Sequence, residues 1–153
     1  MLTESQQKQK QLYETDYHLW VLETVKQLQN QNLDSLDWEN LIEEVLDLSK
    51  REKRKLQSLL KRLLEHLLKL KYWDNEIQTN QRHWRGEIAN FRQQIKYQLE
   101  DSPSLKSYLM EIFLQSYQDA RIIASEKSGL PLSTFPVEPI APLDQVLDEN
   151  WLP

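Results

Sequence analysis

Cysteine is absent from this chain of 153 residues, and glycine occurs only twice. Without cysteine the chain has no disulfide, no zinc–thiolate site and no thiol nucleophile. Two glycines are too few for a turn-rich β-sandwich or barrel, and for a glycine-rich loop that cradles phosphate. No run reaches the ~18 apolar residues that a membrane-spanning helix needs. The first residues also lack the basic and apolar pattern of a signal peptide, so we expect a cytoplasmic protein.

Charged residues make up 28% of the chain and hydrophobic residues 39%, which is typical of a polar globular protein. The length predicts a single domain over residues 1–153. The charge is uneven: residues 1–49 hold 3 Lys or Arg and 10 Asp or Glu, a net −7, whereas residues 50–71 hold 9 and 2, a net +7. The basic block either pairs with the acidic segment or lies on a solvated face, or else it attracts phosphate backbones.

Apolar residues recur at helical spacing from residue 15 onward. They predict a first helix near residues 15–30, with Thr15 or Asp16 as its N-cap. The preceding segment, residues 1–11, is rich in Gln and Lys and has little apolar content, so we expect it to be frayed.

Two further apolar stripes cover the next part of the chain. Asp37 is a suitable N-cap for a helix whose stripe runs over residues 38–48, and a leucine stripe follows over residues 56–70. The polar stretch between the stripes contains no Gly or Pro that would end a helix. Residues 37–72 therefore form either one helix of roughly 35 residues or two shorter ones.

The rest of the chain predicts two more helices and an extended segment. A turn over residues 72–79 precedes a helix over 81–100, and Ser102-Pro103 is a typical start for the next helix. Gly129 suits a left-handed helix stop, after which prolines make residues 130–153 an arm packed on the bundle. The fold class is all-α: a helical bundle of about four long helices with a Pro-rich extended C-terminal arm.

Glu44 and His66 form the first candidate site. Each lies on the flank of its apolar stripe, where a residue meets neighbouring helices, and Glu–His clusters in helical bundles can hold a metal. The two would meet only if the helix kinks or across a dimer. The Glu-x-x-His pattern of di-metal bundles is absent, so we expect no metal, no cofactor and a structural role for the histidine.

Arg62 and His66 form a second candidate, because residues four apart share a helix face. The pair resembles the Arg–His motif of helical ribonucleases of the HEPN kind, with a shorter spacing. In that interpretation His66 is the acid–base group and Arg62 holds a phosphate, and Glu44 is a further candidate catalytic residue. The alternative is an ordinary charged flank of a leucine-rich helix.

Arg85, Arg92 and Lys96 lie along one predicted helix together with Trp84. Basic residues beside an aromatic ring can bind single-stranded nucleic acid by charge and stacking, and Arg62 would extend this surface. Trp84, however, belongs to the apolar stripe and fits the core equally well.

Asp16, Trp20 and Glu43 are candidates for protein interaction. Tyrosines and Trp20 cluster around Asp16, and such rings suit contact surfaces as well as packing between helices. Glu43 points nearly opposite its apolar stripe, towards solvent or a partner.

Several sequence blocks together resemble the domain-of-unknown-function 29 family, a mostly cyanobacterial group, from about residue 12 to the end. The blocks are Tyr13-x-x-Asp16-x-x-x-Trp20, Leu36-Asp37-x-x-Asn40-Leu41-Ile42-Glu43-Glu44-Val45, Leu63-Leu64-x-His66-Leu67-Leu68-Lys69, Trp84-Arg85-x-x-Ile88, Ser102-Pro103-Ser104-Leu105, Tyr117-x-x-Ala120-Arg121 and Phe135-Pro136. The chain departs from the family at His83, where a serine is expected, and in lacking a glycine near Ser49. The resemblance implies an all-helical protein and brings no established activity.

These observations favour a non-enzymatic interaction or regulatory module that forms homo-oligomers or binds another protein. The long leucine helix and the bipolar charge support this interpretation, and no coherent catalytic set opposes it. An RNA-binding protein or ribonuclease and a metal-binding bundle remain the two alternatives.

Overall fold

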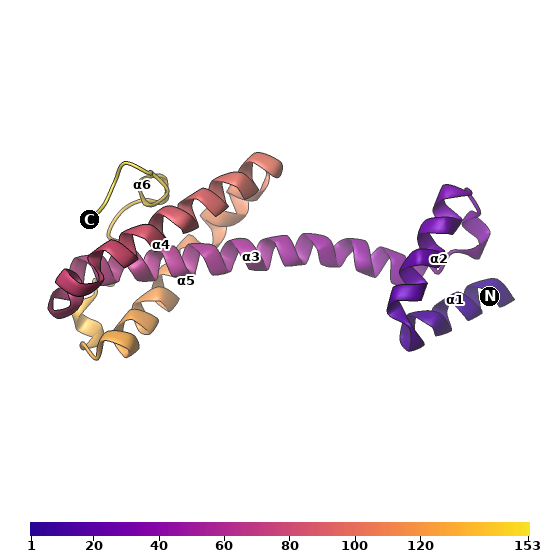
Figure 1. The fold of residues 1–153 in the computed structure, drawn as a ribbon, viewed down its shortest axis with the longest axis horizontal. Helices are drawn as coiled ribbons and strands as arrows, with labels where there is room; N and C mark the ends of the chain where they lie inside the picture. The colour runs from indigo at the N-terminus through magenta and orange to yellow at the C-terminus, as the bar shows by residue number, and fades with distance from the viewer. The chain divides into compact units, whose positions relative to one another are not determined.

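A computed structural model describes all residues, 1–153, and contains helices and no strand, which confirms the all-α class (Figure 1). The elements are α1 (Glu4–Thr15), α2 (Tyr17–Gln29), η1 (Leu33–Ser35), α3 (Trp38–Tyr72), α4 (Asp74–Asp101), α5 (Leu105–Ser128), η2 (Leu132–Thr134) and α6 (Leu143–Val146). None of these helices combines the length and the apolar character needed to cross a bilayer.

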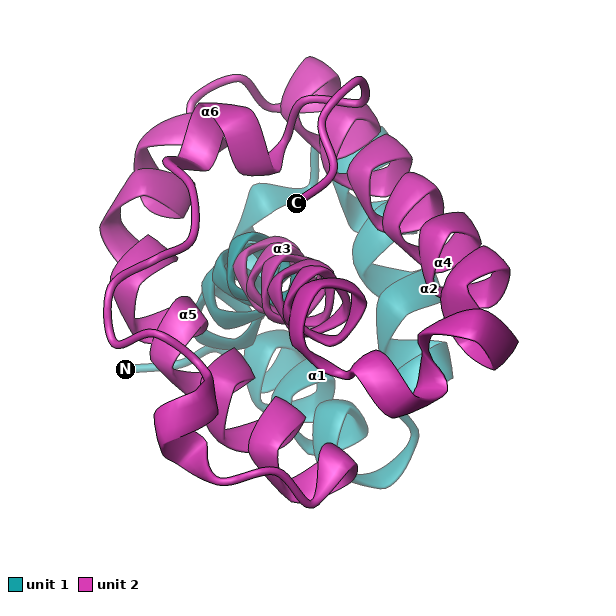
Figure 2. Cartoon of the chain, turned by 90° about the vertical axis from the view of Figure 1, so that its left-hand side faces the viewer, with its two compact units in different colours: residues 1–51 teal, residues 52–153 magenta.

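The chain divides into two compact units, residues 1–51 and 52–153 (Figure 2). Helix α3 contributes residues 38–51 to unit 1 and residues 52–72 to unit 2. Its middle stretch, 49–55, is exposed throughout and offers no apolar side chain to either core. Each unit is described by itself below.

Residues 38–72 form one helix of 35 residues, so the question of one helix or two is settled in favour of one. The polar stretch Ser49–Lys55 consists mostly of Lys, Arg and Glu, which favour helix without any tertiary contact. Asp37 caps this helix as expected, with its carboxylate accepting from the backbone N–H of Asn40 at 3.4 Å.

Unit 1 begins with a helix where we expected a frayed segment. Thr3 and Gln6 form a capping box that ties down the first turn of α1, with bonds of 3.0 and 3.1 Å. Further along, the amide of Gln9 is buried and donates to Thr24 and to the backbone oxygen of Trp20. Hydrogen bonds of polar side chains therefore fix the first turn of α1 and attach this helix to α2.

Helix α2 corresponds to the predicted first helix. Asp16 is its N-cap and accepts from the backbone N–H of Leu19 at 3.1 Å, which confirms one of the two caps that we considered. Only two apolar side chains of unit 1, Trp20 and Leu36, are buried.

Unit 2 has a continuous core of twenty buried apolar residues from α3, α4, α5 and the segment after α5. Helix α4 begins at Asp74, so the predicted turn over residues 72–79 is wrong; acidic residues in the first turn favour this early start. Helix α5 begins at Leu105, later than the Ser102-Pro103 start that we expected. Gly129 ends α5 with φ 73° and donates to Ser125, as predicted.

The segment after α5 contains η2, α6 and irregular backbone where we expected an extended arm. Phe135 and Val146 lie in the core of unit 2. Tyr117 donates its hydroxyl to the backbone oxygen of Pro136 at 2.7 Å, and Arg121 donates through Nε to that of Phe135 at 3.1 Å. Buried side chains of α5 thus bind the backbone of this segment directly.

Candidate functional site

An apolar groove runs between α2 and residues 38–51 of α3 in unit 1, with a volume of about 230 Å³. Five of its lining side chains are large and stay exposed: Tyr17, Val25, Leu28, Val45 and Leu48. Val45 is 58% exposed and Leu48 59% exposed. This groove is therefore a candidate surface for contact with another molecule.

Two tyrosines of unit 1 donate hydrogen bonds to one carboxylate at the edge of this groove, and we call this group the Tyr13–Glu44–Tyr17 clamp. Tyr13 donates to one oxygen of Glu44 at 2.6 Å and Tyr17 donates to the other at 2.7 Å, and Arg51 lies 3.9 Å from the second oxygen. The hydrogen bond to Glu44 raises the pKa of Tyr13 to about 12. The same two hydrogen bonds lower the pKa of Glu44, so the carboxylate is ionised and fully engaged.

The candidate interaction residues of unit 1 have different environments. Trp20 is buried, packs against the rings of Tyr13 and Tyr17, and lines the groove. Asp16 is exposed and serves as the cap of α2. Glu43 is exposed and makes no hydrogen bond or ion pair. Sequence reasoning singled out this cluster but did not identify the two tyrosines as partners of Glu44.

His66 of unit 2 contacts the backbone of Arg62 rather than its side chain. Nδ1 of His66 lies 2.8 Å from the carbonyl oxygen of Arg62, and the imidazole packs edge-on against the ring of Phe91. Burial lowers the pKa of His66, although the bond to Arg62 opposes this shift. Arg62 itself is exposed. A structural histidine explains these contacts without a catalytic role for the pair.

Glu65, next to His66, is a buried carboxylate that the sequence analysis did not single out. Its oxygens accept from Lys69 at 3.0 Å and Lys127 at 3.2 Å. Burial alone would raise the pKa of Glu65, but the hydrogen bonds and charges of the two lysines outweigh it and keep this pKa below its usual value. The i, i+4 spacing of Glu65 and Lys69 on a leucine-rich helix was the available signal.

Glu44 and His66 both belong to α3, but to different units, 22 residues apart. Each has partners within its own unit: Tyr13 and Tyr17 for Glu44, and the backbone of Arg62 for His66. No group of three or more His, Asp or Glu side chains is arranged to hold a metal. That the chain takes no metal or cofactor stays a prediction.

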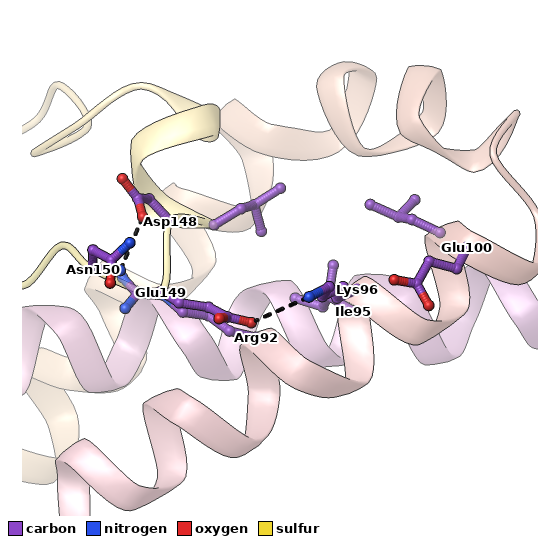
Figure 3. A pocket seen from close by; sticks show the side chains of 9 residues that line it. Arg92, Ile95, Lys96, Glu100, Asp148, Glu149 and Asn150 are labelled. Atoms are coloured by element: carbon purple, nitrogen blue, oxygen red, sulfur yellow. Dashed lines mark hydrogen bonds and ion pairs between the residues drawn. The ribbon is translucent and has the colours of Figure 1, made fainter.

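Arg85, Arg92 and Lys96 do come together, along one side of α4 in unit 2. They line two adjoining clefts that also contain Glu149. Figure 3 shows the cleft of Arg92 and Lys96. Arg92 is buried, whereas Arg85 and Lys96 are exposed. Sequence reasoning found this set of residues through its helical spacing, but not the clefts.

Comparison with known proteins gives a family and no function. No curated protein and no solved structure matches the chain. Residues 12–152 match the family described as Domain of unknown function DUF29. This range covers nearly the whole chain, including both tyrosines of the clamp, His66 and the basic side of α4, and the chain therefore belongs to the DUF29 family.

Proposed function

We propose that this chain is a non-enzymatic, cytoplasmic interaction module that forms a homodimer through unit 1. The observation that carries the proposal is the exposed apolar groove between α2 and α3. Unit 1 has 51 residues and buries only two apolar side chains, which is too little for a self-sufficient core. A unit of this kind gains stability by covering its apolar surface with another molecule.

The occupant we propose is the same groove of a second copy. Each copy offers two adjacent helices with apolar rows, and two such pairs make a four-helix bundle around a shared core. On α3 the groove residues Leu41, Val45 and Leu48 follow the four- and three-residue spacing of a coiled-coil seam. A two-fold axis near Val45 would bury this seam in both copies at once.

Charge favours an antiparallel arrangement of the two α3 helices. Glu39 precedes Val45 by six residues and Arg51 follows it by six, so an axis at Val45 brings Glu39 of one copy level with Arg51 of the other. A parallel arrangement would set like charges against each other along the whole seam. The Tyr13–Glu44–Tyr17 clamp supports the same role, because it fixes the wall of the groove.

The test is the mass of the full chain in solution, measured by sedimentation at tens of micromolar protein. We expect a dimer for the natural chain and a monomer for Val45→Asp, because the substitution puts a charge into the seam. Leu114→Asp is the matched control: Leu114 is 62% exposed but lies on α5 of unit 2, so this variant should stay dimeric.

A charge exchange tests the orientation. Arg51→Glu should weaken the dimer by placing two acidic groups together, and adding Glu39→Arg should restore it. A natural chain that stays monomeric over the whole concentration range contradicts the proposal. A dimer that persists in Val45→Asp contradicts the choice of surface.

A further inference from the structure

Arg92 of α4 is a buried cation without a counter-ion. Arg92 is only 4% exposed, and its Nε donates to the backbone oxygen of Val146 at 2.9 Å. Its Nη2 atom is buried and has no hydrogen-bond partner. No carboxylate of unit 2 lies within ion-pair distance of it. Asp148 and Glu149 favour the charge of Arg92 from a distance but do not pair with it directly. Because a buried charge without a direct partner is costly, its presence at this place calls for a function.

Two clefts meet at Arg92, with volumes of about 460 and 510 Å³. Lys96 lines the first cleft and Arg85 lines the second, so a cation stands on either side of Arg92. Both volumes fall in the range of roughly 300–1,000 Å³ that is typical of small-molecule sites. The planar guanidinium of arginine matches the paired oxygens of a carboxylate or phosphate.

The acidic residues beside Arg92 are only loosely engaged with the cations. Glu149 lies 3.9 Å from the ammonium of Lys96, and both side chains are largely exposed (Figure 3). Such an exposed pair contributes little, so an incoming anion can replace it. Asp148 is occupied elsewhere, because its carboxylate accepts from the backbone N–H of Asn150 at 2.9 Å.

Apolar side chains share the first cleft with the cations. Ile95 and Leu99 of α4 and Leu147, just after α6, line it together with Arg92 and Lys96. A bare inorganic ion would leave this apolar wall uncovered. A ligand that carries an apolar group next to its charge would cover it and gain affinity from the buried area.

We propose that unit 2 binds a small molecule in which an oxyanion, a carboxylate or a phosphate, is attached to an apolar body. The oxyanion lies at Arg92, between Arg85 and Lys96, and replaces Glu149 as the partner of Lys96. The apolar body lies against Ile95, Leu99 and Leu147. This site does not depend on dimerisation through unit 1.

The first experiment is a titration of the full, isotope-labelled chain by NMR at low salt. The probes are phenyl phosphate, benzoate and orthophosphate. We expect saturable shifts for the backbone amides of residues 85–99 and 147–150, with at least one aromatic probe binding more tightly than orthophosphate. The tighter of the two aromatic probes identifies the ligand as a phosphate or a carboxylate. The absence of a saturable shift for every probe up to about 10 mM overturns the proposal.

Variants with opposite expected signs make the test specific. Lys96→Gln should weaken probe binding and Glu149→Gln should strengthen it, each by about threefold, the effect of one unit charge at roughly 6 Å in water. Arg92→Gln should abolish binding. If Arg92→Gln does not fold, Lys96→Gln and Glu149→Gln still test the proposal, because both change exposed side chains. Arg54→Gln, which removes an exposed cation from α3, is the control and should leave binding unchanged.

Two outcomes would contradict the proposal even if the probes bind. One is an equal effect of Lys96→Gln and Arg54→Gln, which would mean that the probes only respond to overall charge. The other is tight binding of a single-stranded RNA oligonucleotide while the small probes fail, which would make the basic side of α4 a nucleic-acid surface instead.

Discussion

Unit 1 and unit 2 use their apolar residues in opposite ways. Unit 2 is twice as long and buries twenty apolar side chains, whereas unit 1 buries two. Of the large apolar side chains that stay exposed, thirteen lie in unit 1 and six in unit 2. Unit 2 therefore contains its own core, and unit 1 keeps much of its apolar surface free for contact.

Polar groups follow the same division. In unit 2, the buried side chains of Arg121 and Tyr117 hold the segment after α5 in place, and buried Glu65 pairs with Lys69 and Lys127. In unit 1, the best-defined polar cluster is the Tyr13–Glu44 clamp at the edge of the groove. In the proposed function, unit 2 is the stable scaffold and unit 1 is the contact surface.

The largest expected effect comes from deleting a core side chain of unit 2. Leu63 is fully buried, so Leu63→Ala should lower the free energy of unfolding by about 3 kcal/mol. Leu48 of unit 1 is exposed, and Leu48→Ala should change it by less than about 0.5 kcal/mol in protein dilute enough to be monomeric. Urea unfolding followed by circular dichroism measures both. If both variants lose the same free energy of unfolding in dilute protein, the groove is covered within one chain, and the contrast between the two units is wrong.

A smaller effect is expected from His66 as the pH falls. Burial keeps the folded-state pKa of His66 below its usual 6.5. The unfolded chain then takes up a proton at higher pH than the folded chain, so the stability contributed by neutral His66 is complete above about pH 6.5. It is lost as the pH falls through the lower folded pKa.

The measurement for His66 is the melting temperature between about pH 7 and about pH 5, the range in which an unperturbed histidine titrates. The natural chain should lose more stability over this range than His66→Gln. His83→Gln is the control, because the side chain of His83 is exposed and makes no hydrogen bond. If the melting temperatures of His66→Gln and His83→Gln fall equally with pH, the buried histidine does not govern the loss of stability in acid.

The helical periodicity of the sequence predicted the class of fold and the stripe of every long helix. It could not decide whether 37–72 is one helix, since the polar stretch 49–55 carries no apolar signal; the absence of Gly and Pro there was the better guide. It missed α1 because that helix has almost no apolar stripe. The capping box of Thr3 and Gln6 was the available signal.

The candidate sites were predictable in part. The sequence placed Arg85, Arg92 and Lys96 along one helix, and in the structure they line two adjoining clefts of α4. That Arg92 is buried without a counter-ion depends on how the segment around Val146 packs against α4, a contact across 54 residues of sequence. Likewise, the partners of Glu44 come from two other helices, and no local pattern encodes such long-range contacts.

The smallest expected effect concerns the clamp in unit 1. Tyr13→Phe removes the hydroxyl that donates to Glu44 at 2.6 Å but leaves the ring packed against Trp20. We expect hydrogen exchange of the α1 amides to accelerate by about fivefold or less, the equivalent of one partly exposed hydrogen bond. The amides of unit 2 should not change, because the scaffold does not depend on this contact. Faster exchange in both units would show that the clamp stabilises the whole chain, and the division into a scaffold and a contact surface would then be wrong.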